Sequence, residues 1–211
     1  MVEKNPIFLP LFTFPVMQVQ LDLDLEKLTE FAFEMWNKNK KGVQYSNKGG
    51  WHSDFILKEK NEEFIGLKEE INHYLQMYHS QVFRGMKFKG KLQQILDSMW
   101  VNINKKHQYN EWHTHAGTTL SGVYYIKHDG SYEQGNIIFK NPNHPYITIN
   151  HFPPKTVETW NSLTAGIFDM TPKPNMLLIF PAWLEHKVEM NSKNSSRISL
   201  SFNSIPRLEK K

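Results

Sequence analysis

The 211-residue sequence contains no cysteine. This absence excludes disulfide crosslinks, zinc sites built from thiolates and a cysteine nucleophile. Any metal that the chain binds must therefore be held by histidine, aspartate or glutamate side chains. Histidine occurs ten times, so a pair of close histidines needs support from other residues before it indicates a site.

Long apolar runs and internal repeats are missing as well. No stretch approaches the ~20 apolar residues of a membrane-spanning helix. The N-terminal segment MVEKNPIFLPLFTFPVMQVQ is partly apolar, but Pro6, Pro10 and Pro15 interrupt it, and it has neither a basic start nor a small-residue cleavage site. We therefore expect a soluble protein of the reducing cytoplasm that has no membrane partner.

Basic and acidic residues are mixed along the chain, and neither kind dominates. The net charge is +4, and the apolar share of 39% is that of a globular protein. The basic cluster at residues 38–41 is typical of a solvated helix end, because the helix dipole favours lysine there. The sequence therefore contains no clear signal for nucleic-acid binding.

Two amphipathic helices are predicted in residues 1–90. Residues 24–39 and residues from about 62 to 80 carry apolar side chains at helical spacing. Asp22 or Asp24 can cap the first helix, and Gly42 follows its end. We interpret the two apolar stripes as core faces, formed by Leu25, Leu28, Phe31, Ala32 and Met35 and by Phe64, Leu67, Ile71, Tyr74, Leu75 and Tyr78.

Short β-rich runs separated by glycine, proline and asparagine follow from residue 91 onward, as in antiparallel sandwiches and barrels. The runs are LQQILDSMWVNINK, TTLSGVYYIKH, GNIIFKN, YITINHF, AGIFDM, NMLLIFPAW, HKVEM and SRISLSFN. We therefore expect one α+β domain over residues 1–211. In it, residues 1–90 form a helical support and residues 91–205 form a jelly-roll core that carries the site.

Two histidines stand one residue apart in the segment NEWHTHAG. In extended backbone, His113 and His115 point to the same face, so both imidazoles can approach one metal ion. A third candidate ligand, His186, follows the apolar run LLIFPAWLE and can reach the same end of a jelly roll. These three histidines form the candidate metal site.

Arg197 and Ser199 come shortly after His186, in the run SRISLSFN. They share one strand face, so a guanidinium and a hydroxyl can hold the same carboxylate. A metal-binding histidine followed at this distance by Arg-x-Ser is the pattern used by Fe(II)/2-oxoglutarate oxygenases.

The chain resembles the 2-oxoglutarate/Fe(II)-dependent oxygenase family of bacteria and phages. The resemblance runs from about residue 11 to residue 203 and rests on SNKGGWHS, HTHAGTTLSGVYYI, GNIIFKNP, LLIFPAWLEHKV and RISLSFN, in this order. It implies a double-stranded β-helix, which is a jelly roll, with Fe(II) as the metal and 2-oxoglutarate as the cosubstrate. It also implies that Arg197 and Ser199 hold the far carboxylate of 2-oxoglutarate.

The first ligand strand departs from the family pattern. Most such oxygenases have His-x-Asp or His-x-Glu there, which completes a triad of two histidines and one carboxylate, whereas this chain has His113-Thr114-His115. The site then has either three histidines or two histidines with an open position, as Gly117 would allow. Glu111 is a less favoured donor because it lies further back on the same face. We favour three histidines.

Several other side chains are weaker candidates. Tyr124 and Tyr125 lie on opposite strand faces, so one belongs to the core, and we place Tyr125 beside 2-oxoglutarate. Asn102 and Asn104 either line the pocket or bond neighbouring backbone, and Asn102 is the candidate cosubstrate contact. We interpret Trp51 as a packing residue. Solvated histidines are expected in the polar segments at His107, His144 and His151.

The predicted activity is hydroxylation of a peptidyl side chain or a small metabolite. Expected partners are 2-oxoglutarate, oxygen and a substrate, for which a prolyl or other peptidyl side chain, a free amino acid and a small metabolite all stay open. A homodimer is compatible with the sequence. Two rival functions are a cupin-like metal enzyme that uses no 2-oxo acid and a non-catalytic jelly-roll binding module. Arg197 and Ser199 argue against the first rival.

Overall fold

The computed structural model describes residues 13–150 and 154–209. Pro6, Pro10 and His151, which the sequence analysis singles out, lie outside these residues. Both predicted helices are confirmed, as α1 (Leu25–Lys38) and α2 (Glu62–Val82). Each begins at a side-chain cap, because a carboxylate or amide oxygen accepts a backbone N–H that would otherwise lack a partner. The cap is Asp24 in α1 and Asn61 in α2.

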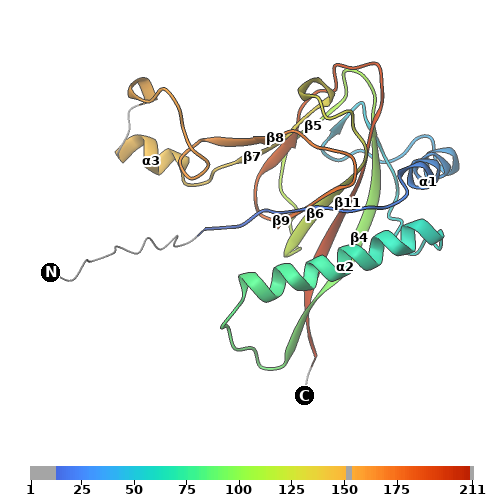
Figure 1. The fold of residues 1–211 in the computed structure, drawn as a ribbon, viewed down its shortest axis with the longest axis horizontal. Helices are drawn as coiled ribbons and strands as arrows, with labels where there is room; N and C mark the ends of the chain where they lie inside the picture. Colours follow the sequence, from blue (N-terminus) through green and yellow to red (C-terminus); the bar gives the residue numbers. More distant parts are fainter. Residues whose placement is uncertain (1–12, 151–153, 210–211) are drawn as a thin grey trace.

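The strands form two antiparallel sheets, and the predicted α+β jelly roll is confirmed (Figure 1). The six-stranded sheet has the order β1 (Met17–Gln20), β9 (Met176–Pro181), β6 (Leu120–Lys127), β11 (Arg197–Glu209), β4 (Lys91–Asn104) and β3 (Trp51–His52). The five-stranded sheet has the order β2 (Asn47–Lys48), β5 (Tyr109–His113), β10 (His186–Val188), β7 (Ile137–Lys140) and β8 (Ile167–Met170).

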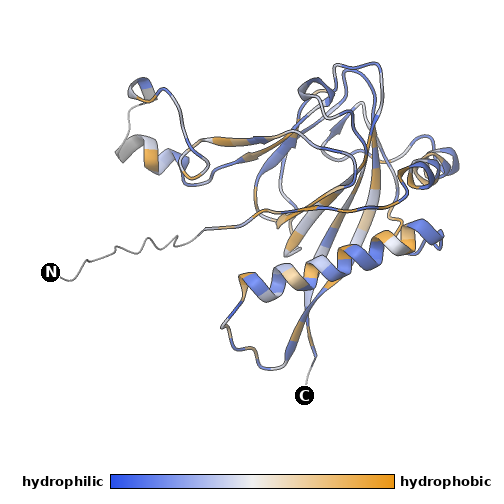
Figure 2. Ribbon diagram, viewed as in Figure 1, coloured by the Kyte–Doolittle hydropathy of each residue, from blue (hydrophilic) through white to orange (hydrophobic). Residues whose placement is uncertain are grey.

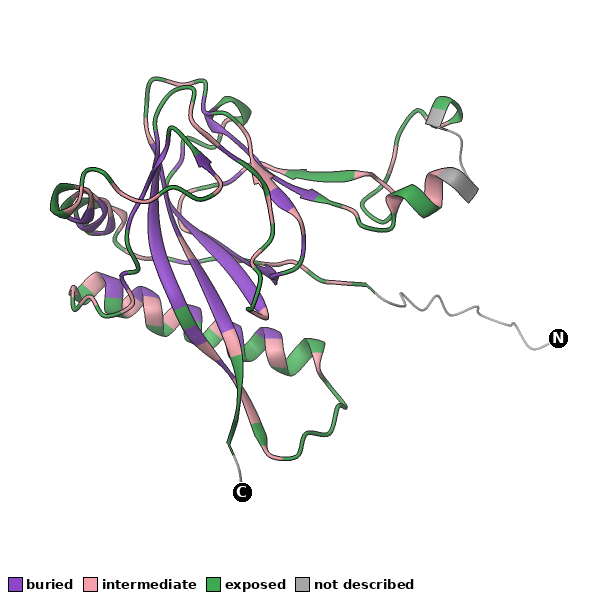
Figure 3. Ribbon diagram, turned by 180° about the vertical axis from the view of Figure 1, so that it is seen from behind, coloured by how far each residue is buried: buried purple, intermediate pink, exposed green. Residues whose placement is uncertain are grey.

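The core has two parts because side chains on a strand alternate between its faces. On the outer face of the six-stranded sheet, strand residues such as Tyr124 and Leu200 pack against buried residues of α1 and α2, for example Phe64. Between the sheets, Tyr125 and Phe180 pack in a second cluster. Figure 2 shows the apolar patches along α2, and Figure 3 shows the buried central strands in purple.

The described residues 13–90 contribute three strands in addition to the two helices, which the sequence analysis does not anticipate. β1 pairs with β9, β2 with β5 and β3 with β4. The strands β2 and β3 have two residues each, so they are too short to show an alternating pattern. The connection at Gly49 and Gly50 thus joins β2 of the five-stranded sheet to β3 of the six-stranded sheet.

The prediction of a strand in the run YITINHF is wrong. Its described residues lie in the short helix α3 (His144–Asn150), which belongs to the connection that extends away from β7 and β8 (Figure 1). Pro145 suits the first turn of a helix, where a backbone N–H is not needed. The hydroxyl of Thr148 donates to the carbonyl oxygen of His144, one turn earlier. The β-branched residues of this run thus have no neighbouring strand to pair with.

The described residues also form two 3₁₀ helices of three residues each, η1 (Tyr132–Gln134) and η2 (Pro154–Thr156). Within the part of the chain that the structure describes, no helix is both long enough and apolar enough to cross a membrane.

Candidate metal and cosubstrate site

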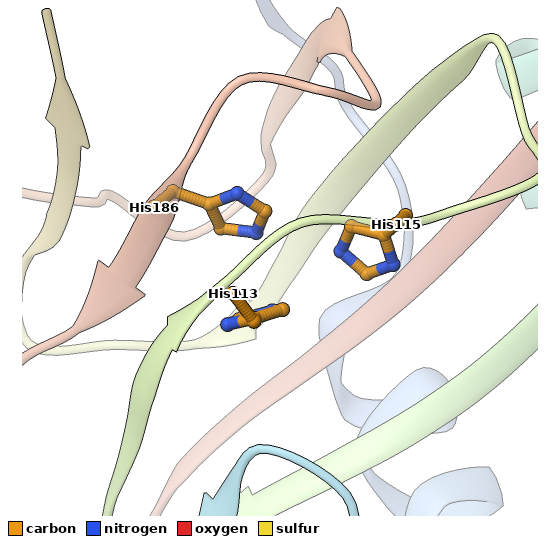
Figure 4. A group of neighbouring side chains, drawn as sticks. All are labelled: His113, His115 and His186. Atoms are coloured by element: carbon orange, nitrogen blue, oxygen red, sulfur yellow. The ribbon is translucent and has the colours of Figure 1, made fainter. Parts of the chain in front are cut away.

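His113 and His186 face each other across two paired strands. They occupy directly opposite positions on β5 and β10, and residues opposite each other in an antiparallel pair project to the same face. Their ring centroids are 4.3 Å apart. Strand pairing therefore fixes two of the three expected ligands beside each other (Figure 4).

His115 lies two residues beyond the end of β5. Its backbone N–H donates to the carbonyl oxygen of Ala182 (2.9 Å), which ties it to the turn before His186. Its ring centroid is 5.1 Å from that of His113 and 5.3 Å from that of His186. One ligand nitrogen of each ring lies within 4.8 Å of the other two. Three nitrogens that share one ion at about 2.1 Å, with tetrahedral or octahedral angles, lie about 3.0 to 3.4 Å apart, so the rings would have to rotate inward to share one ion.

Backbone carbonyl groups orient two of these rings. Nδ1 of His113 lies 2.7 Å from the carbonyl oxygen of Glu111, and Nδ1 of His186 lies 2.8 Å from that of Leu184. Because a carbonyl oxygen only accepts hydrogen bonds, we assign the ring proton to Nδ1 in both residues. The lone pair of Nε2 is then directed away from the backbone and free for a metal.

Burial keeps the three imidazoles neutral. It lowers the pKa of His113, lowers that of His115 to about 4 and lowers that of His186 well below the ordinary value. Close imidazoles are a second cause for His115 and His186, because a charge on one ring disfavours a charge on the next. Neutral imidazole is the form that binds metals, so no proton has to leave the three rings before a metal ion binds at neutral pH.

No aspartate or glutamate among the described residues belongs to this cluster. Glu111, the less favoured carboxylate donor, is exposed and pairs with Lys48 at 3.3 Å. Gly117 lies in the turn after His115 with a φ of +78°. The geometry thus brings three histidines together, and no carboxylate of the described residues lies in the cluster with them.

A cavity of about 320 Å³ opens between the sheets beside the histidines. The four residues that the sequence analysis assigns to 2-oxoglutarate all line it, namely Asn102, Tyr125, Arg197 and Ser199. Ser199 on β11 lies between Asn102 on β4 and Tyr125 on β6 in the sheet register. Asn102 and Ser199, which are 97 positions apart in the sequence, therefore meet on one wall because their strands are neighbours.

Arg197 is 2% exposed at one end of this wall. Its Nη1 donates to the carbonyl oxygen of Gly135 (3.2 Å) and its Nη2 to Oδ1 of Asn104 (3.0 Å), while its buried Nε has no partner. No acidic residue in the described chain forms an ion pair with it. Burial lowers the pKa of Arg197 to about 10, so the guanidinium stays charged at neutral pH. It is a buried cation that lacks a counter-ion.

Two neighbours of Arg197 remain neutral hydrogen-bonding groups. Asn102 donates from Nδ2 to Oγ of Ser201 (3.0 Å), and its buried Oδ1 has no partner. Burial raises the pKa of the Tyr125 phenol. Tyr124 points to the opposite face, into the core under the helices, and its hydroxyl donates to Asn175. The expected division between the two tyrosines therefore agrees with the structure.

Other sequence candidates lie away from the cluster. Trp51 packs in the core and donates from Nε1 to the carbonyl oxygen of Asn39 (2.8 Å), as a packing residue would. His107 is exposed and has a φ of +65°. The expectation that His144 is solvated is wrong, because it is partly buried and its Nδ1 lies 2.9 Å from the carbonyl oxygen of Thr164.

The sequence analysis misses a group of aromatic side chains that also lines the cavity. His52 on β3 stacks on Trp100 of β4, with centroids 5.3 Å apart and planes 10° apart. Tyr45 and Phe55 flank this pair. Alternation along β4 places Trp100 on the same face as Asn102 and could have identified it. The two-residue strand β3 offers no such signal for His52.

Known structures share this architecture. A prolyl-4-hydroxylase from Pseudomonas putida has a TM-score of 0.59 at 13% identity, with 92% of this chain and 94% of that chain covered. HygX from Streptomyces hygroscopicus, solved with nickel and 2-oxoglutarate bound, has a TM-score of 0.58 at 11% identity, with coverage of 94% and 85%. Viral collagen prolyl hydroxylase from Paramecium Bursaria Chlorella virus-1 has a TM-score of 0.56 at 10% identity, with coverage of 90% and 94%. At such identities the likeness establishes the fold.

The sequence itself establishes the family. No curated protein matches the chain, but the profile of a family described as "Putative 2OG-Fe(II) oxygenase" matches residues 98–203, which are 106 of the 211 residues. The matched region runs from β4 to β11 and contains the three histidines and Arg197. Membership disagrees with both rival functions, a metal enzyme without 2-oxoglutarate and a non-catalytic module. The chain belongs to this family and is an oxygenase that depends on Fe(II) and 2-oxoglutarate.

Proposed function

We propose that His113, His115 and His186 are the iron ligands of this oxygenase. Three observations support the proposal: the rings converge, burial keeps them neutral, and carbonyl groups orient two of them. An all-histidine site carries one negative charge fewer than a site with a carboxylate ligand. We therefore expect weaker retention of Fe(II) than in relatives with two histidines and one carboxylate.

We also propose that Arg197 binds the far carboxylate of 2-oxoglutarate, with Ser199, Tyr125 and Asn102 around it. The buried, unpaired guanidinium is the observation that carries this proposal. A buried charge is costly unless an opposite charge and hydrogen bonds compensate it. A carboxylate bound at this end of the cavity supplies both, since it can accept from Arg197 and from the hydroxyl of Ser199.

The reaction that fits this site is hydroxylation. Iron and 2-oxoglutarate, when bound, supply an oxidative decarboxylation in which 2-oxoglutarate, dioxygen and a substrate C–H group become succinate, carbon dioxide and a C–OH group. The chain's own residues bind and orient: Arg197 holds one end of the cosubstrate, and the apolar wall at Phe180 and Val123 limits the access of water. We propose a peptidyl side chain or a small metabolite as the substrate.

We further propose that residues 1–211 form one domain that acts in the cytoplasm. The helices α1 and α2 share a single core with the six-stranded sheet, which supports one cooperative unit. Calorimetry should therefore record one unfolding transition.

The direct test of the function combines binding and turnover. Anaerobic titration of 2-oxoglutarate into Ni²⁺-loaded protein measures cosubstrate binding, because nickel occupies the site without supporting turnover. Fe(II), 2-oxoglutarate and oxygen together should then release succinate slowly even without the substrate. If the protein neither binds 2-oxoglutarate nor releases succinate, the proposed site is wrong.

A further inference from the structure

The two ends of the cavity differ in charge. Arg197, Ser199 and Ser201 follow one another on the inner face of β11 and all line the cavity. Across the β4 pairing, Arg197 lies opposite Asn104, whereas Ser201 lies opposite Trp100. The wall therefore changes from a buried cation at one end to an aromatic surface at the other.

Four rings form this aromatic wall, which we define as Tyr45, His52, Phe55 and Trp100. The centroid of His52 is 5.1 Å from that of Tyr45, and the centroid of Trp100 is 6.2 Å from that of Phe55. The ring centroid of Trp100 also lies 5.8 Å from that of His115, a proposed iron ligand. A group that packs against the aromatic wall is thus held directly beside the metal site and away from Arg197.

The aromatic wall runs from the interior to the surface. His52 and Trp100 are buried, with exposed fractions of 5% and 7%, whereas Tyr45 and Phe55 are 66% and 64% exposed. Exposed aromatic side chains at the mouth of a cavity provide contact area outside it. This contact area suits one group of a larger molecule better than a small molecule that the cavity encloses completely.

The aromatic half of the cavity offers no charged partner. No aspartate, glutamate or lysine belongs to the described residues that line the cavity. Burial lowers the pKa of His52, so this ring adds no cation at neutral pH. Asp54, the acidic residue next to Phe55, lies outside the lining and accepts a hydrogen bond from Asn39 at 2.9 Å. Its charge opposes the lowering of the His52 pKa, but burial has the larger effect.

These features select against a free amino acid. Its ring or apolar side chain could pack on the aromatic wall, but its ammonium and carboxylate groups would enter the cavity mouth with it. The ammonium would meet no acid among the described residues that line the cavity. The carboxylate would find Arg197 already bound to 2-oxoglutarate. In a peptide both groups are neutral amides, whose removal from water costs much less than that of an unpaired charge.

We propose that the aromatic wall binds an uncharged, ring-bearing side chain, prolyl or aromatic, of a peptide substrate. This inference rests on the proposed function, because it takes His115 as an iron ligand and Arg197 as the cosubstrate anchor. It narrows the substrate from the open set of peptidyl side chains, free amino acids and metabolites to neutral peptide groups.

The test compares capped and free amino acids as probes. N-acetyl-proline methylamide and N-acetyl-phenylalanine methylamide are titrated against free proline and free phenylalanine, with Ni²⁺-loaded protein and saturating 2-oxoglutarate, and binding is followed by ligand-observed NMR. At least one capped probe should bind tenfold or more tightly than its free counterpart. Equal binding of the free form, or no binding of either capped probe, would overturn the proposal.

Variants at the mouth locate the probe. Tyr45→Ala and Phe55→Ala should each weaken capped-probe binding about three- to tenfold, as expected for the loss of one aromatic contact. Both side chains are largely exposed, so the variants should fold. Tyr132→Ala removes a ring that is 58% exposed and lies outside the cavity lining, so it serves as the matched control. An equal loss in Tyr132→Ala would also overturn the proposal.

The same samples separate this inference from the proposed function. Calorimetric titration of 2-oxoglutarate measures the anchor at Arg197 and does not involve the aromatic wall. Normal 2-oxoglutarate binding without binding of the capped probes rejects the peptide inference alone. Failure of 2-oxoglutarate to bind rejects the proposed site.

Discussion

His113 and His186 lie directly opposite each other on β5 and β10, and each directs its Nδ1 to the backbone carbonyl oxygen two residues earlier. The two rings are therefore held by the same local device on two antiparallel strands. It fixes the tautomer that leaves Nε2 free for a metal, before any metal binds. The backbone N–H of His115 donates to the carbonyl oxygen of Ala182. Among the described residues, its ring does not form the hydrogen bond to a backbone carbonyl that His113 and His186 form.

Removal of any one histidine should weaken metal binding. His113→Ala, His115→Ala and His186→Ala each remove one of three proposed ligands, so each variant should bind Ni²⁺ at least tenfold more weakly than wild type. Isothermal titration and metal analysis provide the measurement. The matched control is His73→Ala, because His73 is an exposed histidine on α2. Unchanged nickel affinity in a cluster variant would remove that histidine from the ligand set.

The metal-free protein should lose stability as the pH falls from about 6.5 toward 4. Burial lowers the folded-state pKa of His115 to about 4 and that of His113 and His186 below the ordinary 6.5. Between these values the unfolded chain binds more protons than the folded chain, so acid favours unfolding. Well above pH 6.5 the three groups are neutral in both states and contribute no pH dependence.

Thermal unfolding in the presence of a chelator, at pH 7.5 and 5.0, measures this effect. His115→Gln should reduce the drop in Tm between the two pH values, because glutamine does not titrate. His73→Gln should leave the drop as in wild type. A drop that is the same in His115→Gln as in wild type would contradict the assigned cause.

The sheet under the helices should be sensitive to loss of apolar volume. Phe64 of α2 is fully buried and stacks on Phe31 of α1, with centroids 4.9 Å apart. Phe64→Ala should lower the free energy of unfolding by about 3 to 5 kcal/mol, measured by urea denaturation. Ile65→Ala, at a neighbouring position that is 38% exposed, should cost much less. Similar losses in both variants would show that α2 does not pack as described.

Sequence pattern could predict the parts of the site that depend on one strand. Alternation pairs His113 with His115 and Arg197 with Ser199 on common faces. It could not show that β10 lies beside β5, which brings His186 to His113, because pairing between distant strands leaves no local pattern. The expectation that a later strand of a jelly roll ends near the first ligand pair supplied His186 as the third candidate.

The remaining misses have local physical causes. The run at residues 146–152 has the β-branched residues of a strand, but its described part is helical and lies beyond the sheets. Tertiary context overrides propensity in such a segment. The aromatic wall depends on β3, whose two residues are too few for any period to be read. The aromatic wall was therefore the part of the cavity that the sequence predicted least.

Arg197 provides the sharpest test of the proposed cosubstrate site, because an anion stabilises a buried guanidinium that has no acidic partner. Arg197→Ala removes the charge and the two-pronged donor, and truncation of such a buried partner costs about 2 to 5 kcal/mol. The affinity for 2-oxoglutarate should therefore fall by roughly 30-fold to several thousand-fold. Nickel affinity at the histidines should change little. Anaerobic titration of each ligand measures the two effects separately.

Two further variants show whether geometry or charge matters. Arg197→Lys should recover only part of the lost affinity, since an ammonium keeps the charge but not the planar pair of donors that matches a carboxylate. Arg207→Ala is the matched control, because Arg207 lies on the same strand but is exposed, and it should bind 2-oxoglutarate as wild type does. If Arg197→Ala and Arg207→Ala bind 2-oxoglutarate equally well, the cation at position 197 has only a structural role and the anion must be held elsewhere in the cavity.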